Sequence, residues 1–389
     1  MDFLAGPRGR RMCLEWALRL EDEQAPGGTG SSEAGLRGAV WDWSMSEERP
    51  GRSVMFYLAV EDTEGMTEAQ VQEELMRARR EWRPPERPDP TQVAALADAV
   101  TLRAPDEGES LILLRGTVDN ARYWQPPDPE DDLAGLSEMR DALRRVAEVL
   151  AAAPSTQWWA SPVDRSGQWA QTYVDSETAL RWIGHEAAGA LADWRLRMVD
   201  GERESLNLHL REPHKTYGGE WWSAPPHSLA DSTRSLSDGS PLGLWCVEDS
   251  TGPDHLLAQS IRVPAGARVV EVDGSSDWVD LCRQFPLDVT WSRRGDWGEC
   301  TGRTSGAWVV PDWAALAASG VDAVHLTVRG YVACAGAVLD VGGGRASTVA
   351  GWDPDRTFWL CDVEPRGEVV TWESDSSGPG LQWQRVPAS

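Results

Sequence analysis

Tryptophan is the residue that most constrains this chain, because 22 of the 389 residues are Trp, against 5 Tyr and 4 Phe. A large, flat indole either fills a hydrophobic core or forms a stacking wall for a base, a sugar or a cation. Several tryptophans come in short clusters, as at 41–43, 158–159 and 221–222. The sequence alone leaves both interpretations open.

The charge of the chain excludes some classes of partner. The formal net charge is −25, and nearly all of the positive charge is Arg, since Lys215 is the single lysine. A chain this acidic repels phosphate, so we expect no binding to duplex DNA and no affinity for anionic membrane surfaces. A basic protein partner would suit this charge.

Targeting segments and cysteines point to a cytoplasmic protein. The first residues hold no apolar run of signal-peptide length, and no stretch approaches the roughly 18–20 apolar residues of a membrane span. The six cysteines show no C-x-x-C spacing, so we expect free thiols that are mostly buried. Because His and Cys pairs at short spacing are also missing, we predict no metal site.

Hydrophobic periodicity predicts an α+β fold with a mixed N-terminal domain, a central helix pair and a β-rich C-terminal domain. We place a mixed domain at 1–130, a helical connector at 131–204, a β-rich ligand-binding or catalytic domain at 205–366 and a flexible tail at 367–389. The connector should hold two helices, 133–153 and 177–199, that pack together because apolar residues recur at three- and four-residue steps.

Shorter patterns predict the elements within the two outer domains. In the first domain, we expect strands at 13–20, 38–44, 53–60 and 110–115, and helices at 67–82 and 91–100. In the last, we expect strands at 243–248, 267–272, 308–310, 323–328 and 358–363. Short helices should lie at 276–285 and 312–318, with Ser276 and Asp312 as their N-caps.

Two Trp-Trp pairs precede similar small, Pro-containing stretches, at 157–166 and 220–229. We expect each pair to be extended and to lead into a Pro-fixed turn. Alternate side chains on a strand point to opposite faces, so one indole of each pair could be core while the other lines a cleft. A purely structural role for both pairs remains the alternative.

The second pair opens a segment, 221–235, that combines hydroxyls, an imidazole and a guanidinium. Stacking from Trp222, fork-shaped donors from Arg234 and hydroxyls from Ser223 and Thr233 suit a ligand with a base and a phosphate. Arg294 is a second phosphate candidate. The same composition also describes an ordinary polar loop.

His325 lies in a predicted strand, where it shares a face with Ala323 and Thr327, opposite Val324 and Leu326. A His on the more polar face of a strand could act as a general acid or base. The alternative is a solvated or structurally bonded His. The Asp-Pro-Asp run at 353–355 indicates a turn first, and a metal pair only as a remote alternative.

The runs 310–316, 322–331 and 350–360, together with 157–164, resemble a set of uncharacterised Trp-rich proteins of actinobacteria. That resemblance implies no activity. Trp222 with Ser223, the run 232–234 and the strand with His325 are also similar, in order, to elements of ADP-ribosyltransferase-like domains. This second resemblance implies NAD as the ligand and a nicotinamide cleft faced by His325. No Glu-x-Glu or Gln-x-Glu pair stands in a late strand, so arginine-directed transfer is not implied.

Two hypotheses of different classes follow. In the first, the protein binds a nucleotide-like ligand and acts as an NAD-dependent ADP-ribosyltransferase or an NAD glycohydrolase. His325 would be catalytic, and the cofactor NAD would be bound by Trp222, Ser223, Thr233, Arg234 and Arg294. In the second, the protein is a non-enzymatic acidic interaction protein that partners or neutralises a basic protein.

Overall fold

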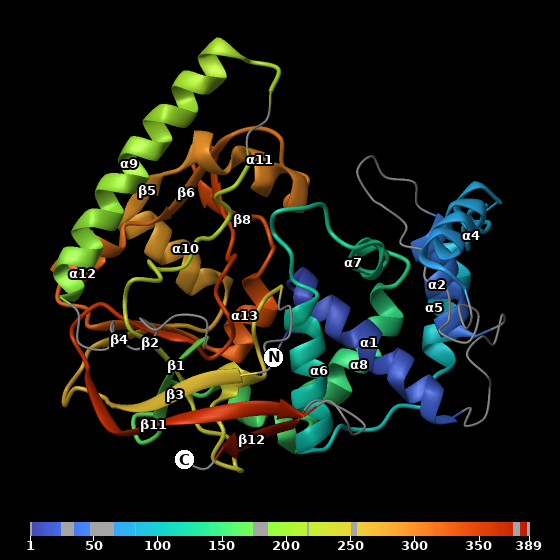
Figure 1. Ribbon diagram of the computed structural model, residues 1–389, viewed down its shortest axis with the longest axis horizontal. Helices are drawn as coiled ribbons and strands as arrows, with labels where there is room; N and C mark the ends of the chain where they lie inside the picture. Colours follow the sequence, from blue (N-terminus) through green and yellow to red (C-terminus); the bar gives the residue numbers. More distant parts are fainter. Residues whose placement is uncertain are drawn as a thin grey trace.

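The computed structural model describes residues 2–24, 35–46, 66–81, 83–173, 186–215, 218–249, 255–375 and 382–386. It has the mixed α+β fold that the sequence predicts, with the N-terminal helices gathered on one side and the strands on the other (Figure 1). Among the described residues, no helix is long and apolar enough to cross a membrane.

The described residues before Gln168 form helices. The predicted helices at 67–82 and 91–100 are confirmed, but the strands predicted at 13–20, 38–44 and 110–115 are wrong, because these residues lie in α1, α2 and α6. The strand predicted at 53–60 lies outside the described residues. The elements are α1 (Pro7–Gln24), α2 (Leu36–Ser46), α4 (Glu68–Glu81), α5 (Pro90–Ala99), α6 (Glu107–Asp119), α7 (Pro129–Gly135), α8 (Arg140–Ala152) and the 3-10 helix η1 (Pro154–Ala160).

The polar residues of α1 include a series with a helical period, Arg8, Arg11, Glu15 and Arg19, so the partial alternation at 13–20 was the weaker signal. Arg8 and Arg11 are nevertheless buried. In α6 the apolar run at 111–114 suggests a strand, but a capping box starts the helix. Asp106 accepts a hydrogen bond from the Glu109 backbone N–H at 2.8 Å, and the Glu109 carboxylate accepts one from the Asp106 N–H at 2.9 Å.

The predicted helix pair exists in part but does not pack together. Residues 133–153 are divided between α7 and α8, and the described part of the second helix is α9 (Ala187–Arg211). The helix α8 packs against α1 and α5, whereas α9 packs against α11 (Thr290–Thr301) and α12 (Trp313–Ala318), on the opposite side of the molecule (Figure 1).

An eight-stranded sheet forms the base of the C-terminal part, in the order β12-β11-β3-β1-β2-β10-β7-β4. Only β4 and β7 pair in parallel among its described strands. The segment expected to be a flexible tail contributes β12 and most of β11 to this sheet. The strands are β1 (Gln168–Tyr173), β2 (Asp231–Arg234), β3 (His255–Arg262), β4 (Val269–Val272), β7 (Ala323–Leu326), β10 (Thr357–Trp359), β11 (Glu364–Asp375) and β12 (Gln382–Val386).

A four-stranded sheet, in the order β5-β6-β9-β8, lies among the remaining helices. Its strands are β5 (Pro286–Asp288), β6 (Ala307–Pro311), β8 (Leu339–Gly342) and β9 (Arg345–Ser347), and the helices that contact it include α10 (Ser275–Gln284) and α11. The helix α13 (Val328–Cys334) packs against α10 and α1. Asp312 caps α12 as predicted. The predicted Ser276 cap is wrong, because α10 follows Gly274 without a side-chain cap. The strand predicted at 243–248 is also wrong, since a 3-10 turn, η2 (Leu242–Leu244), begins there.

Most described tryptophans belong to the core. Trp278 contacts Trp313 and Trp352 at ring-centre distances of 5.9 and 6.0 Å, and Trp352 meets Phe358 edge-on at 5.6 Å. Such tilted and edge-to-face contacts are the favoured geometry for aromatic pairs. The tryptophans that are less than 2% exposed are Trp16, Trp159, Trp278, Trp297, Trp308, Trp313, Trp352 and Trp359. All six cysteines are free, and all but Cys361 are buried.

We expect Leu150→Asp to destabilise the protein by about 3 kcal/mol or more, because Leu150 is fully buried on α8 and the new carboxylate would have no partner. Glu148→Asp introduces the same residue at an exposed position of the same helix and should change the free energy of unfolding little. Urea denaturation of both variants tests this. Equal stabilities would show that α8 is not packed as described.

Candidate functional site

The register of the large sheet aligns four polar side chains on one face. Ser232 of β2 lies opposite Thr357 of β10, Thr357 opposite His325 of β7, and His325 opposite Glu271 of β4. Residues paired across neighbouring strands share a face of the sheet. The side chain of His325 therefore points to the face away from the side chains of Val324 and Leu326, as its sequence position predicts. This face is covered, however, because His325 is completely buried.

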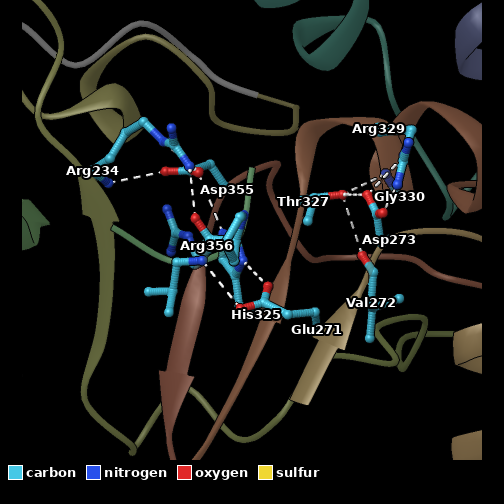
Figure 2. A network of polar contacts seen from close by, with 12 residues as sticks. Arg234, Glu271, Val272, Asp273, His325, Thr327, Arg329, Gly330, Asp355 and Arg356 are labelled. Carbon is cyan, nitrogen blue, oxygen red and sulfur yellow. Dashed lines mark hydrogen bonds and ion pairs between the residues drawn. The ribbon is translucent and has the colours of Figure 1, made fainter. Parts of the chain in front are cut away.

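Two carboxylates hold the imidazole of His325. Its Nδ1 lies 2.5 Å from Glu271 Oε2, and its Nε2 lies 3.3 Å from Asp355 Oδ1 (Figure 2). Burial lowers the pKa of His325, but the hydrogen bonds and charges of Asp355 and Glu271 outweigh burial and raise this pKa to about 9. Both ring nitrogens therefore carry protons at neutral pH and donate to the carboxylates.

Asp355 also holds Arg234. Its carboxylate accepts hydrogen bonds from Arg234 Nε at 2.7 Å and from the Arg234 backbone N–H at 2.9 Å. The guanidinium lies 4.7 Å from the ring centre of Trp158, and Pro162 O lies 3.3 Å from Arg234 Nη2. Two cations thus balance Glu271 and Asp355 in a buried network, which we call the Asp355 network.

The loop that contains Asp355, residues 353–356, also carries side chains to the other face of the sheet. Asp355 has a φ of +58°, a conformation that Asp tolerates better than most residues. On its two sides, Asp353 and Arg356 form an ion pair of 2.6 Å, and Arg356 also reaches Asp231 at 3.3 Å. The predicted Asp-Pro-Asp turn is therefore also a junction between two polar clusters.

Beside this junction lies a cavity of about 430 Å³. Two indoles form part of its wall. Its ionisable groups are three carboxylates, one guanidinium and the imidazole of His227, an exposed residue. Burial raises the pKa of Asp231. The lining residues are Gln171, Thr172, Trp221, Trp222, His227, Asp231, Val247, Glu248, Leu256, Gly351, Asp353 and Arg356.

Glycine and backbone contacts fix the position of the two indoles. Gly351 has a φ of +69°, and a Cβ there would lie 2.5 Å from the Trp222 Cβ, so only Gly allows this approach. Ser223 exchanges hydrogen bonds with Ala350, at 2.8 and 2.9 Å. The rings of Trp221 and Trp222 meet at 5.3 Å and 82°.

Glu248 is the most perturbed carboxyl group of the cavity. Burial and the charge of Asp353 raise its pKa to about 8. Both carboxylate oxygens are buried without a hydrogen bond of good geometry, as are the neighbouring hydroxyls of Tyr123 and Tyr331. Buried polar groups left in this state are unusual and are a common feature of sites that bind a ligand or water.

The structure separates the residues that the sequence grouped into one site. Trp222 lines the cavity, but Arg234 and His325 belong to the Asp355 network on the opposite face of the sheet. Ser223 bonds Ala350, and the Thr233 hydroxyl accepts the Gly243 N–H at 3.0 Å.

Arg294 lies apart from both clusters. This exposed residue of α11 lies over Trp291, 5.1 Å from the ring centre, and contacts His209 of α9 at 3.3 Å.

The four acidic and arginine residues of the cavity were not among the predicted site residues: Asp231, Glu248, Asp353 and Arg356. Asp353 and Arg356 lie in a run that the sequence marked as a turn, and Asp231 directly precedes the hydroxyls that were singled out. For Glu248 the sequence gives no signal, because its raised pKa comes from burial beside tyrosines that are far away in the sequence.

Comparison with known proteins finds no matching family model, no matching curated protein and no matching solved structure. Within the described residues, no group of three or more His, Cys, Asp or Glu side chains is arranged to hold a metal ion. The carboxylates of Asp353 and Asp355 instead bind Arg356 and Arg234.

We predict that the Asp355 network makes stability fall as pH rises from about 6.5 to about 9. The pKa of His325 is higher in the folded protein than its ordinary 6.5, so the charged imidazole stabilises the fold below 6.5 and this contribution is lost through 9. The loss is on the order of 3 kcal/mol.

Urea denaturation between pH 6 and 9.5 measures this slope, and His325→Gln should lose the part of it that His325 contributes. His255→Gln removes an exposed His and should keep it. Glu248 also loses stabilisation over part of this range, but it does so in both variants. An unchanged slope in His325→Gln would contradict the network as described.

Proposed function

We propose that the cavity binds the nicotinamide–ribose half of NAD and that the protein cleaves the N-glycosidic bond, by hydrolysis or by transfer of ADP-ribose. The observation that supports this is the cavity's combination of a tryptophan pair with Asp231, Glu248 and Asp353. A volume of about 430 Å³ suits a small ligand or one half of a dinucleotide.

The charge of the lining favours the nicotinamide end over the phosphates. The oxidised nicotinamide ring is a cation, and both the faces of indoles and nearby carboxylates attract cations. Among the residues that the structure describes, Arg356 is the only Lys or Arg that lines the cavity, and it is already paired with Asp231 and Asp353. A triphosphate such as ATP would meet net repulsion there.

The proposed chemistry uses Glu248 as a general base. When water attacks the ribose carbon, the electron pair of the broken C–N bond passes to the ring nitrogen and nicotinamide leaves as a neutral molecule. Glu248, in its ionised form, takes the proton of the water and faces the positive charge that develops on the sugar. Asp353 and Asp231 would accept hydrogen bonds from ribose hydroxyls.

The residues first singled out take different parts in this proposal. Trp222 keeps its role as a stacking wall. Ser223, Thr233, Arg234 and His325 hold the segments that carry the cavity residues and act as positioning residues. Arg294 has no part in the cavity, because it pairs with Trp291 and His209.

Calorimetric titration with NAD, NADH and ATP tests the binding step. NADH differs from NAD in having a neutral ring, so we expect NAD to bind at least about tenfold more tightly than NADH. Trp222→Ala should weaken NAD binding about tenfold through lost stacking. Trp291→Ala removes a tryptophan outside the cavity and should have no effect. Equal binding of NAD and ATP would contradict the proposal.

Release of nicotinamide, followed by chromatography, tests the chemical step. We expect the rate to rise as pH passes through about 8, the pKa of Glu248, because the base must be ionised. Glu248→Gln should lower the rate about a hundredfold or more and leave NAD binding nearly unchanged. A rate that is independent of Glu248 would exclude it as the base.

The alternative, a non-enzymatic acidic partner of a basic protein, draws on the net charge and on the exposed apolar residues Leu196 and Leu210 of α9. If the protein binds none of the nucleotides in the titration, this alternative replaces the enzyme.

A further inference from the structure

A second cavity, of about 320 Å³, lies among α1, α7 and α8. It shares no lining residue with the cavity of Trp222. Its ionisable groups are Arg10, Arg140, Arg144 and Asp2, and the half-buried Leu4 and Leu136 contribute apolar surface. In a chain with a net charge of −25, three guanidiniums around one cavity form an unusual local excess of positive charge.

These guanidiniums are poorly neutralised by the protein itself. Arg140 forms no ion pair with any described residue. Arg10 donates to the carbonyls of Leu4 and Ala5, at 3.1 and 3.5 Å, and its buried Nε has no acceptor. Arg144 pairs with Asp141, one turn back on the exposed side of α8. Asp2, the one carboxylate in the lining, accepts a hydrogen bond from the Leu4 N–H at 3.0 Å.

The beginning of α8 adds to this positive field. Arg140 is the first residue of this helix, and Met139, at its N-cap, supplies no side-chain acceptor. The N-terminal end of a helix carries a partial positive charge and favours anions. Burial and the neighbouring charges of Arg8 and Arg140 lower the pKa of Arg10, although Asp131 opposes them. Like charges held this close are stabilised when an anion enters between them.

We propose that this cavity is a binding site for a small phosphate monoester with an apolar body. Three arginines and one aspartate leave the lining with two net positive charges, which match a phosphate monoester of about −1.5 to −2 at pH 7. The planar fork of Arg suits phosphate oxygens. The leucine side chains would contact the apolar part of the ligand, which a bare inorganic anion lacks.

Calorimetric titration of the whole protein with phenyl phosphate, inorganic phosphate and benzoate tests the site. We expect phenyl phosphate to bind most tightly, at least about tenfold more tightly than either of the others. Benzoate has the ring without the dianion, and inorganic phosphate has the dianion without the ring. Benzoate binding as tightly as phenyl phosphate would overturn the assignment to a phosphate ester, and no binding of phenyl phosphate at millimolar concentration would overturn the site.

Substitutions connect any binding to these side chains. Arg140→Gln should weaken phenyl phosphate binding about tenfold or more, and because Arg140 is exposed and unpaired, the variant should melt like the parent. Arg10→Gln should have at least as large an effect.

Two controls separate this site from net charge and from the NAD cavity. Arg197→Gln changes the net charge equally on the exposed surface of α9, and Trp222→Ala alters the other cavity. Both should leave phenyl phosphate binding unchanged. An equal loss in Arg197→Gln and Arg140→Gln would show a general charge effect and overturn the proposal.

Discussion

The contacts of the Asp355 carboxylate hold together the polar groups on both faces of the large sheet. It bonds Arg234 and His325 on one face, while its neighbours Asp353 and Arg356 turn to the cavity on the other. A buried carboxylate without cations would be strongly destabilising, and two buried cations without carboxylates would be equally so. The network is therefore stable only as a whole, and it fixes the loop that shapes the cavity.

The described tryptophans include core residues and residues that line the cavity. Trp278, Trp313 and Trp352 fill the core in edge-to-face contact, whereas the half-buried Trp221 and Trp222 line the cavity. In the first Trp-Trp pair, Trp159 is buried, and Trp158 packs against the core and against the guanidinium of Arg234. The pair lies on the 3-10 helix η1, so the extended conformation predicted for it is wrong.

Sequence reasoning succeeded where one local pattern dominates, and it failed where two local patterns compete or where the partners are distant in the sequence. The amphipathic α4 and α5, the Asp312 cap and the strand of His325 each follow from a few neighbouring residues. In α1 the polar residues Arg11, Glu15 and Arg19 recur every four residues, and this helical period outweighs the partial alternation that predicted a strand. The capping box at Asp106 was a readable signal that outweighs a run of leucines in α6. The partners of Arg234 were not readable, because Asp355 is 121 residues away.

Residues far from the C-terminal strands surround Glu248. Tyr123, which precedes α7, contacts Trp221 at 6.1 Å and lies beside Glu248 with Tyr331 of α13. Arg8 of α1, paired with Asp131, adds its positive charge near both hydroxyls. Removing the N-terminal helices would therefore expose Glu248 to water and return its pKa toward the ordinary range, because burial is the largest cause of its shift. A base with an ordinary pKa would be a weaker one, so the chemistry proposed for the cavity needs both parts of the chain.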